Sequence, residues 1–337
     1  MNIQSAIIKV LDHHDLTAAE MQAVMLQLMR NEASPTQMAA FLVAMRMKGE
    51  TVTELFTAAQ VMQQFMIVVD INSSHLIDTA GTGGDSSQTF NVSTLSSFVA
   101  AAAGAVVAKH GNKGVSSNSG SANVLTMAGA NLELTPSQVI QCIKELGISF
   151  MFAPLYHPAM KAVAPIRKEL GVRTFFNLLG PLANPAKVPN LVLGVFAKKW
   201  QKIVAEVAQR LNYKHVLVIH SDDGLDEISI AALTNIVELQ HNKITTYTIS
   251  PEQFGLPRGN LKDIQVENAE QSLQLVRAVL DNQEGAAKNI VLLNAGAALY
   301  TAGVTADIKT GIEKAKQVIE NGAAKKKFAD FIVWTNS

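Results

Sequence analysis

Residues 75–85 read HLIDTAGTGGD, a short apolar strand followed directly by a glycine-rich turn. After this turn the sequence predicts an alanine-rich helix over 93–103, a second apolar strand over 105–108 and a helix from about Ser119. A strand, loop, helix and strand at this spacing indicate a parallel crossover, which is right-handed by default. The segment therefore predicts an α/β fold with a central, mainly parallel sheet flanked by helices.

The residues before this segment predict a small helical domain. Capping signals recur, for example at Thr17 and Ser34, so residues 1–70 are expected to form four short helices. Residues 71–337 are assigned to the α/β domain, and helices around 158–182 are expected to pack with the helical one.

The remainder of the α/β domain follows from apolar runs and helix signals. Strands are expected over 191–196 and 216–220, with a hairpin over 236–249 that turns near Asn242. Helices are expected over 135–147, 199–211, 268–280, 307–320 and 323–333.

Composition excludes several classes of protein. The 337 residues carry 28 basic and 28 acidic side chains, so no net charge attracts nucleic acid or an anionic membrane surface. Cys142 is the single cysteine, which agrees with a reducing compartment. The apolar run 98–108 is too short to span a bilayer, and residues 1–15 lack a secretion signal. We therefore expect a cytoplasmic protein that binds neither nucleic acid nor membrane.

Two polar loops carry the features of a phosphate site. The glycines of 81–85 allow close backbone approach, and residues 89–94 (TFNVST) place hydroxyls and N–H groups at a helix start. Residues 109–121 (KHGNKGVSSNSGS) contain two lysines, four serines and no acid. Because loops after neighbouring parallel strands meet at one edge of the sheet, a phosphorylated substrate is expected there. A plain tight turn with ordinary capping by Asn91 or Ser93 is the alternative.

The acidic run DDGLDE over 222–227 follows a predicted strand. Adjacent carboxylates suit Mg²⁺, which often bridges protein carboxylates to substrate phosphates, although a solvated acidic turn has the same composition. Arg167 lies among apolar neighbours, where it could bind a planar carboxylate with two hydrogen bonds or simply pair with Glu169 on a helix surface.

These elements, in this order, resemble the anthranilate phosphoribosyltransferase family of tryptophan biosynthesis. The segments that carry the resemblance are GTGGD (81–85), TFNVST (89–94), KHGN with SS (109–117), SGSA (119–122), HPAMKAVAPIRKELGVRTFFNLLGPLANPA (157–186) and DGLDEIS (223–229). The resemblance implies transfer of the phosphoribosyl group of 5-phosphoribosyl 1-diphosphate to the amine of anthranilate. It also implies a homodimer joined through helical domains and an association with anthranilate synthase.

The resemblance further implies which residues bind each ligand. Phosphoribosyl diphosphate is assigned to Gly81, Gly84, Asp85, Thr89, Asn91, Val92, Ser93, Thr94, Lys109, His110, Gly111, Asn112, Lys113, Gly114, Val115, Ser116, Ser117 and Ser121. Anthranilate is assigned to Gly81, His110, Asn112, Tyr156, His157 and Arg167. Two Mg²⁺ ions are assigned to Ser93, Asp226 and Glu227, and no side chain is expected to act as a nucleophile.

The chain departs from the family pattern near the second loop. Arginine and alanine are usual where Lys113 and Gly114 stand, and the usual ADVLE run reads ANVLT here, with Asn123 and Thr126 replacing two acids. Two other interpretations remain: a nucleoside phosphorylase or a phosphoribosyltransferase for another base, and a catalytically silent homologue that binds nucleic acid or a regulator.

Overall fold

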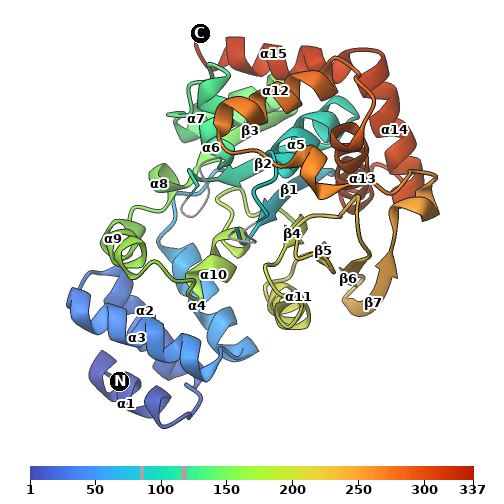
Figure 1. The fold of residues 1–337 in the computed structure, drawn as a ribbon. Helices are drawn as coiled ribbons and strands as arrows, with labels where there is room; N and C mark the ends of the chain where they lie inside the picture. Colours follow the sequence, from blue (N-terminus) through green and yellow to red (C-terminus); the bar gives the residue numbers. More distant parts are fainter. Residues whose placement is uncertain (84–86, 115–119) are drawn as a thin grey trace.

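A computed structural model describes residues 1–83, 87–114 and 120–337. The chain begins with four helices, drawn in blue in Figure 1. They are α1 (Ile3–Leu11), α2 (Ala18–Met29), α3 (Pro35–Lys48) and α4 (Val52–Gln64). Helix caps form at Thr17 and Ser34, where the sequence predicts them, and also at Thr51. Each is a capping box in which the hydroxyl accepts from the backbone three residues later. The small helical domain is therefore present as predicted.

A seven-stranded sheet forms the centre of the rest of the chain. The strands are β1 (Leu76–Gly81), β2 (Val106–Gly111), β3 (Ile148–Phe152), β4 (Asn190–Gly194), β5 (His215–Ser221), β6 (Thr234–Gln240) and β7 (Lys243–Ile249). They lie in the order β3-β2-β1-β4-β5-β6-β7. The first five strands in this order are parallel to one another, and β6 pairs antiparallel with both β5 and β7. The mainly parallel α/β fold is confirmed.

The hairpin between β6 and β7 turns where the sequence predicts. His241 and Asn242 both have positive φ, of 50° and 59°, which is the backbone of the two-residue turns that match strand twist. The hairpin extends the sheet on the side away from β3.

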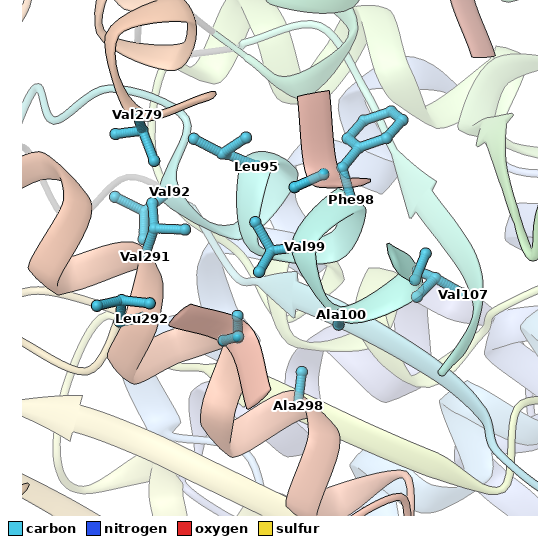
Figure 2. Packing of buried hydrophobic residues seen from close by; sticks show 14 of the residues in the cluster. Val92, Leu95, Phe98, Val99, Ala100, Val107, Val279, Val291, Leu292 and Ala298 are labelled. Atoms are coloured by element: carbon cyan, nitrogen blue, oxygen red, sulfur yellow. The ribbon is translucent and has the colours of Figure 1, made fainter. Parts of the chain in front are cut away.

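The strands bury alternate residues on opposite faces, as a two-residue period requires. Val192 and Leu217 belong to one apolar core, while Leu191 and Val216 belong to another. The first core lies beneath α5 (Val92–Ala102), α13 (Ala286–Thr301) and their neighbours. In Figure 2, Val92 of α5 lies beside Val291 of α13, whereas Phe98 lies on the other side of α5, where it contacts Phe328 and Phe331 of α15 (Ala323–Trp334).

The remaining helices cover both faces of the sheet. They are α6 (Ser121–Met127), α7 (Pro136–Leu146), α8 (Ala153–Tyr156), α9 (Met160–Leu170), α10 (Phe176–Leu182), α11 (Trp200–Arg210), α12 (Ala269–Leu280), α14 (Ile308–Glu320) and α15 (Ala323–Trp334), with short 3₁₀ turns over Pro251–Phe254 and Leu261–Ile264. Among the described residues, none of the helices has both the length and the apolar character needed to cross a membrane.

Helices α9 and α10 pack against the first four helices. Val163 of α9 and Leu179 of α10 belong to the same apolar core as Met25 and Phe41. Figure 1 shows α9 beside α2 and α3, well separated from α14 and α15. The second core continues to α11 and the sheet, so the helical part is joined to the sheet through a shared interior.

Helix α13 and strand β3 are the longer elements that the sequence does not predict. Helix α13 has 12 of its 16 residues buried, including Lys288 and Asn294, so it lacks the apolar stripe that marks a surface helix. Helix α7 ends at Gly147, whose φ is 72°, and strand β3 begins at the next residue. The five residues of β3 show no alternation of apolar and polar side chains. The helix expected from about Ser119 begins at Ser121.

Candidate active site at the carboxyl edge of the sheet

The glycine-rich turn and the acidic loop meet at the carboxyl ends of β1 and β4. Gly83 N donates a hydrogen bond to Asp226 Oδ2 at 3.1 Å. Gly81 and Gly194 are register partners on the two strands, and both face Asp226. A Cβ added to Gly81 would lie 2.5 Å from Asp226 Oδ2. These glycines therefore allow the carboxylate to lie directly over the strand ends.

The second carboxylate contacts the start of α5. Ser93 N donates to Glu227 Oε1 at 3.2 Å, so a negative charge lies where the helix dipole favours it. Asn91 makes no side-chain capping bond to α5, and its Oδ1 accepts from Ser272 Oγ at 2.8 Å. Ordinary capping by Asn91 or Ser93 therefore does not explain this turn.

The first two acids of the DDGLDE run have structural partners. Asp222 accepts from Asn235 Nδ2 at 2.6 Å, and Asp223 accepts from Ser229 Oγ at 2.5 Å. These bonds fix the loop that presents Asp226 to the sheet edge. The acidic run thus divides into two anchoring acids and two acids directed to the candidate site.

Lys109 lies at the end of β2 with 3% of its surface exposed. Its Nζ donates to the carbonyl of Thr79 at 2.6 Å. Burial lowers the pKa of this ammonium, while the charges of Asp78 and Glu227 oppose that change. The Lys109 amine is therefore buried and contacts the backbone of β1 next to the glycine-rich turn.

A buried carboxylate supports the same strand end. Asp78 is fully buried and accepts from Asn184 Nδ2 at 2.7 Å and from His110 N at 3.3 Å. Asn184 also donates to the carbonyl of Ala108 at 2.9 Å. Burial raises the pKa of Asp78 to about 6, against the opposing charge of Lys109. This network fixes the backbone of β2 where the second loop begins.

His110 and His157 form a close imidazole pair with ring centroids 5.0 Å apart. Neither Nε2 atom has a hydrogen-bond partner among the described residues. Burial lowers the pKa of His110 to about 3 and that of His157 to about 4. Both rings are therefore neutral at pH 7 and offer unpaired nitrogen atoms in an interior position.

Arg167 is half-buried on α9. Among the described residues its side-chain partners are Asn177, whose Oδ1 lies 3.4 Å from Nη2, and the ring of Phe176 at 5.6 Å, rather than Glu169. Burial lowers the pKa of this guanidinium. The interpretation that Arg167 pairs with Glu169 on the helix surface is therefore wrong. The guanidinium retains N–H donors for an anion.

Several other predicted residues are placed by the structure. Val92 lies in the apolar core, and Thr94 is buried with its hydroxyl unpaired among the described residues. Thr89 forms an isolated bridge with Gln265. Tyr156 is 1% exposed and donates to the carbonyl of Leu134, so it has a structural role.

The residues expected at the tips of both loops lie outside the described part of the chain. These are Gly84, Asp85, Val115, Ser116 and Ser117. Gly111, Asn112, Lys113, Gly114 and Ser121, at the base of the second loop, are described.

Comparison with known proteins matches this arrangement. A model of the glycosyl transferase family α/β domain matches residues 73–325, and that of its helical bundle domain matches residues 4–66. An anthranilate phosphoribosyltransferase of Thioalkalivibrio sulfidiphilus is 52% identical over 337 residues, covering both chains completely. The chain belongs to the anthranilate phosphoribosyltransferase family.

Solved structures of anthranilate phosphoribosyltransferases have the same fold. The Thermus thermophilus enzyme is 39% identical with a TM-score of 0.92, covering 98% of this chain and 99% of its own. The Saccharomyces cerevisiae enzyme in complex with PRPP and Mg is 26% identical with a TM-score of 0.90, covering 99% and 98%. The reaction expected from the sequence, phosphoribosyl transfer to anthranilate, is confirmed for the family to which the chain belongs.

The structure gives roles to residues that lie in or beside the quoted segments but were not assigned to the site from the sequence. Asp78 and Asn184 support β2, and Gly194 lies under Asp226. Asp78 stands beside a quoted glycine motif, but a lone acid in an apolar strand gives no signal of its partner. Asn184 is 106 residues away from it in the sequence.

Proposed function

We propose that the two polar loops bind 5-phosphoribosyl 1-diphosphate and that Arg167 receives anthranilate. The observation that supports this most strongly is that Asp226 and Glu227 contact the two ends of the first loop, the glycine-rich turn and the start of α5. Asp226 contacts Gly83 and Glu227 contacts Ser93, although these pairs are 143 and 134 residues apart. A site with glycine N–H groups, a helix start and two carboxylates suits a metal-bound diphosphate.

The donor set fits Mg²⁺. Among the described residues, no group of three or more His, Cys, Asp or Glu gathers as a metal site. Asp226 and Glu227 instead provide two half-buried carboxylates, and Glu227 contacts the backbone of Ser93, whose hydroxyl would be a third ligand. Substrate oxygens and water would take the other positions. We assign two ions to these three residues. Bound Mg²⁺ would neutralise charge on the diphosphate leaving group.

The chain's own groups mainly position the substrates. The amine of anthranilate is neutral at pH 7, so attack requires no strong protein base. The barrier lies in breaking the bond between the anomeric carbon and diphosphate, with positive charge developing on the ribose. The glycine turn, the start of α5 and Lys109 would hold the diphosphate, and Asn112 would lie between the two substrates.

The anthranilate end of the site is assigned to α9 and to the imidazole pair. A guanidinium can bind the carboxylate of anthranilate with two charge-assisted hydrogen bonds. His110 and His157 are neutral and buried, so they would provide apolar faces and a nitrogen acceptor for the aromatic amine. Gly81 and Asn112 complete this set, and Tyr156 would act through packing.

The homodimer is proposed to form through the helical domain, residues 1–70. Ile8, Leu11 and Met47 are 63%, 56% and 70% exposed on α1 and α3, which pack together. Large apolar side chains exposed on two packed helices favour a protein partner, and a second copy fits the sequence expectation. The site residues come from 71–337, so each protomer would hold its own site.

Two further expectations remain proposals. A cytoplasmic location agrees with one buried, unpaired cysteine, Cys142. Association with anthranilate synthase would deliver anthranilate directly to the site.

One assay tests the proposed substrates. Diphosphate release from phosphoribosyl diphosphate is measured with anthranilate and with a panel of other aromatic amines, purines and pyrimidines. We expect diphosphate release when anthranilate is the acceptor and none with the other acceptors. Equal release with a nucleobase would favour a phosphoribosyltransferase for another base. No diphosphate release, together with formation of a free base and ribose 1-phosphate from a nucleoside and inorganic phosphate, would favour a phosphorylase.

A further inference from the structure

Asn123, on the first turn of α6, joins the two ends of the second polar loop. Its Oδ1 accepts from Gly120 N at 3.1 Å and from Gly114 N at 3.0 Å. The first bond is the ordinary cap of its own helix, three residues away. The second reaches nine residues back, to the segment that leaves β2. One amide oxygen therefore fixes both α6 and the end of the 109–114 segment.

The same helix turn makes further contacts with this segment. The carbonyl of Asn112 accepts from Ala122 N at 3.2 Å and from Ser121 Oγ at 3.3 Å. A Cβ added to Gly120 would lie 2.7 Å from the carbonyl carbon of Lys113, so the two backbones are in direct contact. The position of Asn112 thus depends on α6. Because the backbones at Gly120 and Lys113 are in direct contact, neither segment can move toward the other.

The segment that Asn123 holds is exposed to solvent. Asn112, Lys113 and Gly114 are exposed, and Lys113 Nζ lies 5.8 Å from the ring of Phe152, so solvent competes for their hydrogen bonds. The single Oδ1 atom of Asn123 accepts from Gly114 N and from Gly120 N, so it holds these two backbone groups together without adding charge to the segment.

We propose that Asn123 is a positioning residue for phosphoribosyl transfer, because it holds Asn112, Lys113 and Gly114 in register against α6. This rests on the role proposed above for residues 109–114. Asn123 itself contacts neither substrate. Its effect should therefore appear in substrate affinity rather than in the stability of the sheet.

The test uses the full chain with two variants and one control. Asn123→Ala removes the acceptor, and Asn123→Asp retains an acceptor but adds charge. Asn321→Ala removes an exposed asparagine whose Oδ1 accepts from Ala323 N, remote from the site. Measurements are KM and kcat for both substrates, the thermal midpoint, and amide hydrogen exchange of the peptide that contains Gly114.

Loss of two neutral hydrogen bonds should raise KM for phosphoribosyl diphosphate by about 10- to 100-fold in Asn123→Ala. Exchange at Gly114 should become faster, while the thermal midpoint shifts no more than in Asn321→Ala. Asn123→Asp should keep slow exchange at Gly114 and recover most of the affinity at saturating Mg²⁺.

The outcomes separate the positioning role from the substrate assignment. Unchanged KM together with unchanged exchange at Gly114 in Asn123→Ala would overturn the proposal. Faster exchange without a change in KM would also overturn it, since the segment would then not serve substrate binding. If Asn123→Ala does not fold, the KM and exchange of Asn123→Asp and of Asn123→Ser, which keeps a shorter acceptor, decide. Failure of the unaltered chain to use phosphoribosyl diphosphate would instead contradict the substrate assignment.

Discussion

Gly194 lies directly beneath Asp226, so closely that a Cβ at position 194 would overlap the backbone carbonyl of the acid. Gly194 ends β4 and pairs in register with Gly81 at the end of β1. The acidic loop therefore rests on two adjacent strand ends that carry no side chains. The height of Asp226 above the sheet is fixed by this close approach.

Gly194→Ala should displace the acidic loop and reduce activity by at least about 100-fold, because overpacking against backbone cannot be relieved by a rotamer change. Gly180→Ala on α10 is the control, since a Cβ there has no atom within 4 Å. Steady-state kinetics and thermal midpoints are measured for both. Comparable activity in the two variants would show that the close approach does not position Asp226.

Asp226→Asn combined with Glu227→Gln should lower activity by orders of magnitude while the fold survives. Both acids are half-buried at the sheet edge, where they would hold Mg²⁺. Activity is titrated with magnesium, and metal binding is measured by calorimetry in the presence of diphosphate. Asp281→Asn is the control, because Asp281 pairs with Lys325 in an exposed contact outside the acidic loop. An unchanged magnesium titration in the double variant would contradict the metal assignment.

The sequence predicts local structure well where the signal is local. Capping at Thr17 and Ser34 and the turn at Asn242 depend on residues within four positions, and each forms as expected. Helix α13 was missed because nearly every face of it is buried, which removes periodicity. The order of strands β3 and β4 around β1 depends on long-range pairing that no local pattern contains.

The candidate site shows the same division. The glycine turn and the acidic pair Asp226 and Glu227 are visible as motifs, and the structure brings them together. The contact between the residues that support them is not visible in the sequence. Asp78 and Asn184 form a buried pair across 106 residues, and single residues of these types are common in any chain.

Replacing apolar surface residues of the helical domain should produce a monomer. Ile8→Glu combined with Leu11→Glu places two charges on exposed positions of α1, where a charge costs little in a monomer but cannot be buried in an interface. Sedimentation at micromolar concentration should then give half the mass of the unaltered chain. Val333→Glu, on exposed α15, is the control. A monomeric unaltered chain would contradict the proposed dimer.

Glu50 should make the stability of the helical domain depend on pH. Burial raises its pKa to about 7 from 4.5, with the charge of Glu54 adding to the effect. The raised value means that the folded chain prefers the protonated acid, so stability is highest below pH 4.5 and falls as pH rises through 7. Glu50→Gln should therefore stabilise by about 3 kcal/mol at pH 8 and by about 1 kcal/mol at pH 5.

Chemical denaturation of Glu50→Gln at the two pH values checks this. Glu133→Gln, at an exposed carboxyl, is the control. An equal effect of Glu50→Gln at pH 5 and pH 8 would show that the Glu50 carboxyl does not change its protonation on folding over this range.

Arg167 should determine the use of anthranilate. Its guanidinium is half-buried beside Phe176, and Asn177 occupies one donor at 3.4 Å, which leaves others for a carboxylate. Hydrogen bonds to charged groups contribute about 1.5–3 kcal/mol, so Arg167→Ala should raise KM for anthranilate by about 10- to 150-fold. Arg167→Lys should recover only part of this loss, because lysine keeps the positive charge but lacks the planar guanidinium. KM for phosphoribosyl diphosphate should not change, and Arg258→Ala, which removes an exposed pair with Glu252, should leave both constants unchanged. Equal damage to the two substrates in Arg167→Ala would place the carboxylate anchor elsewhere.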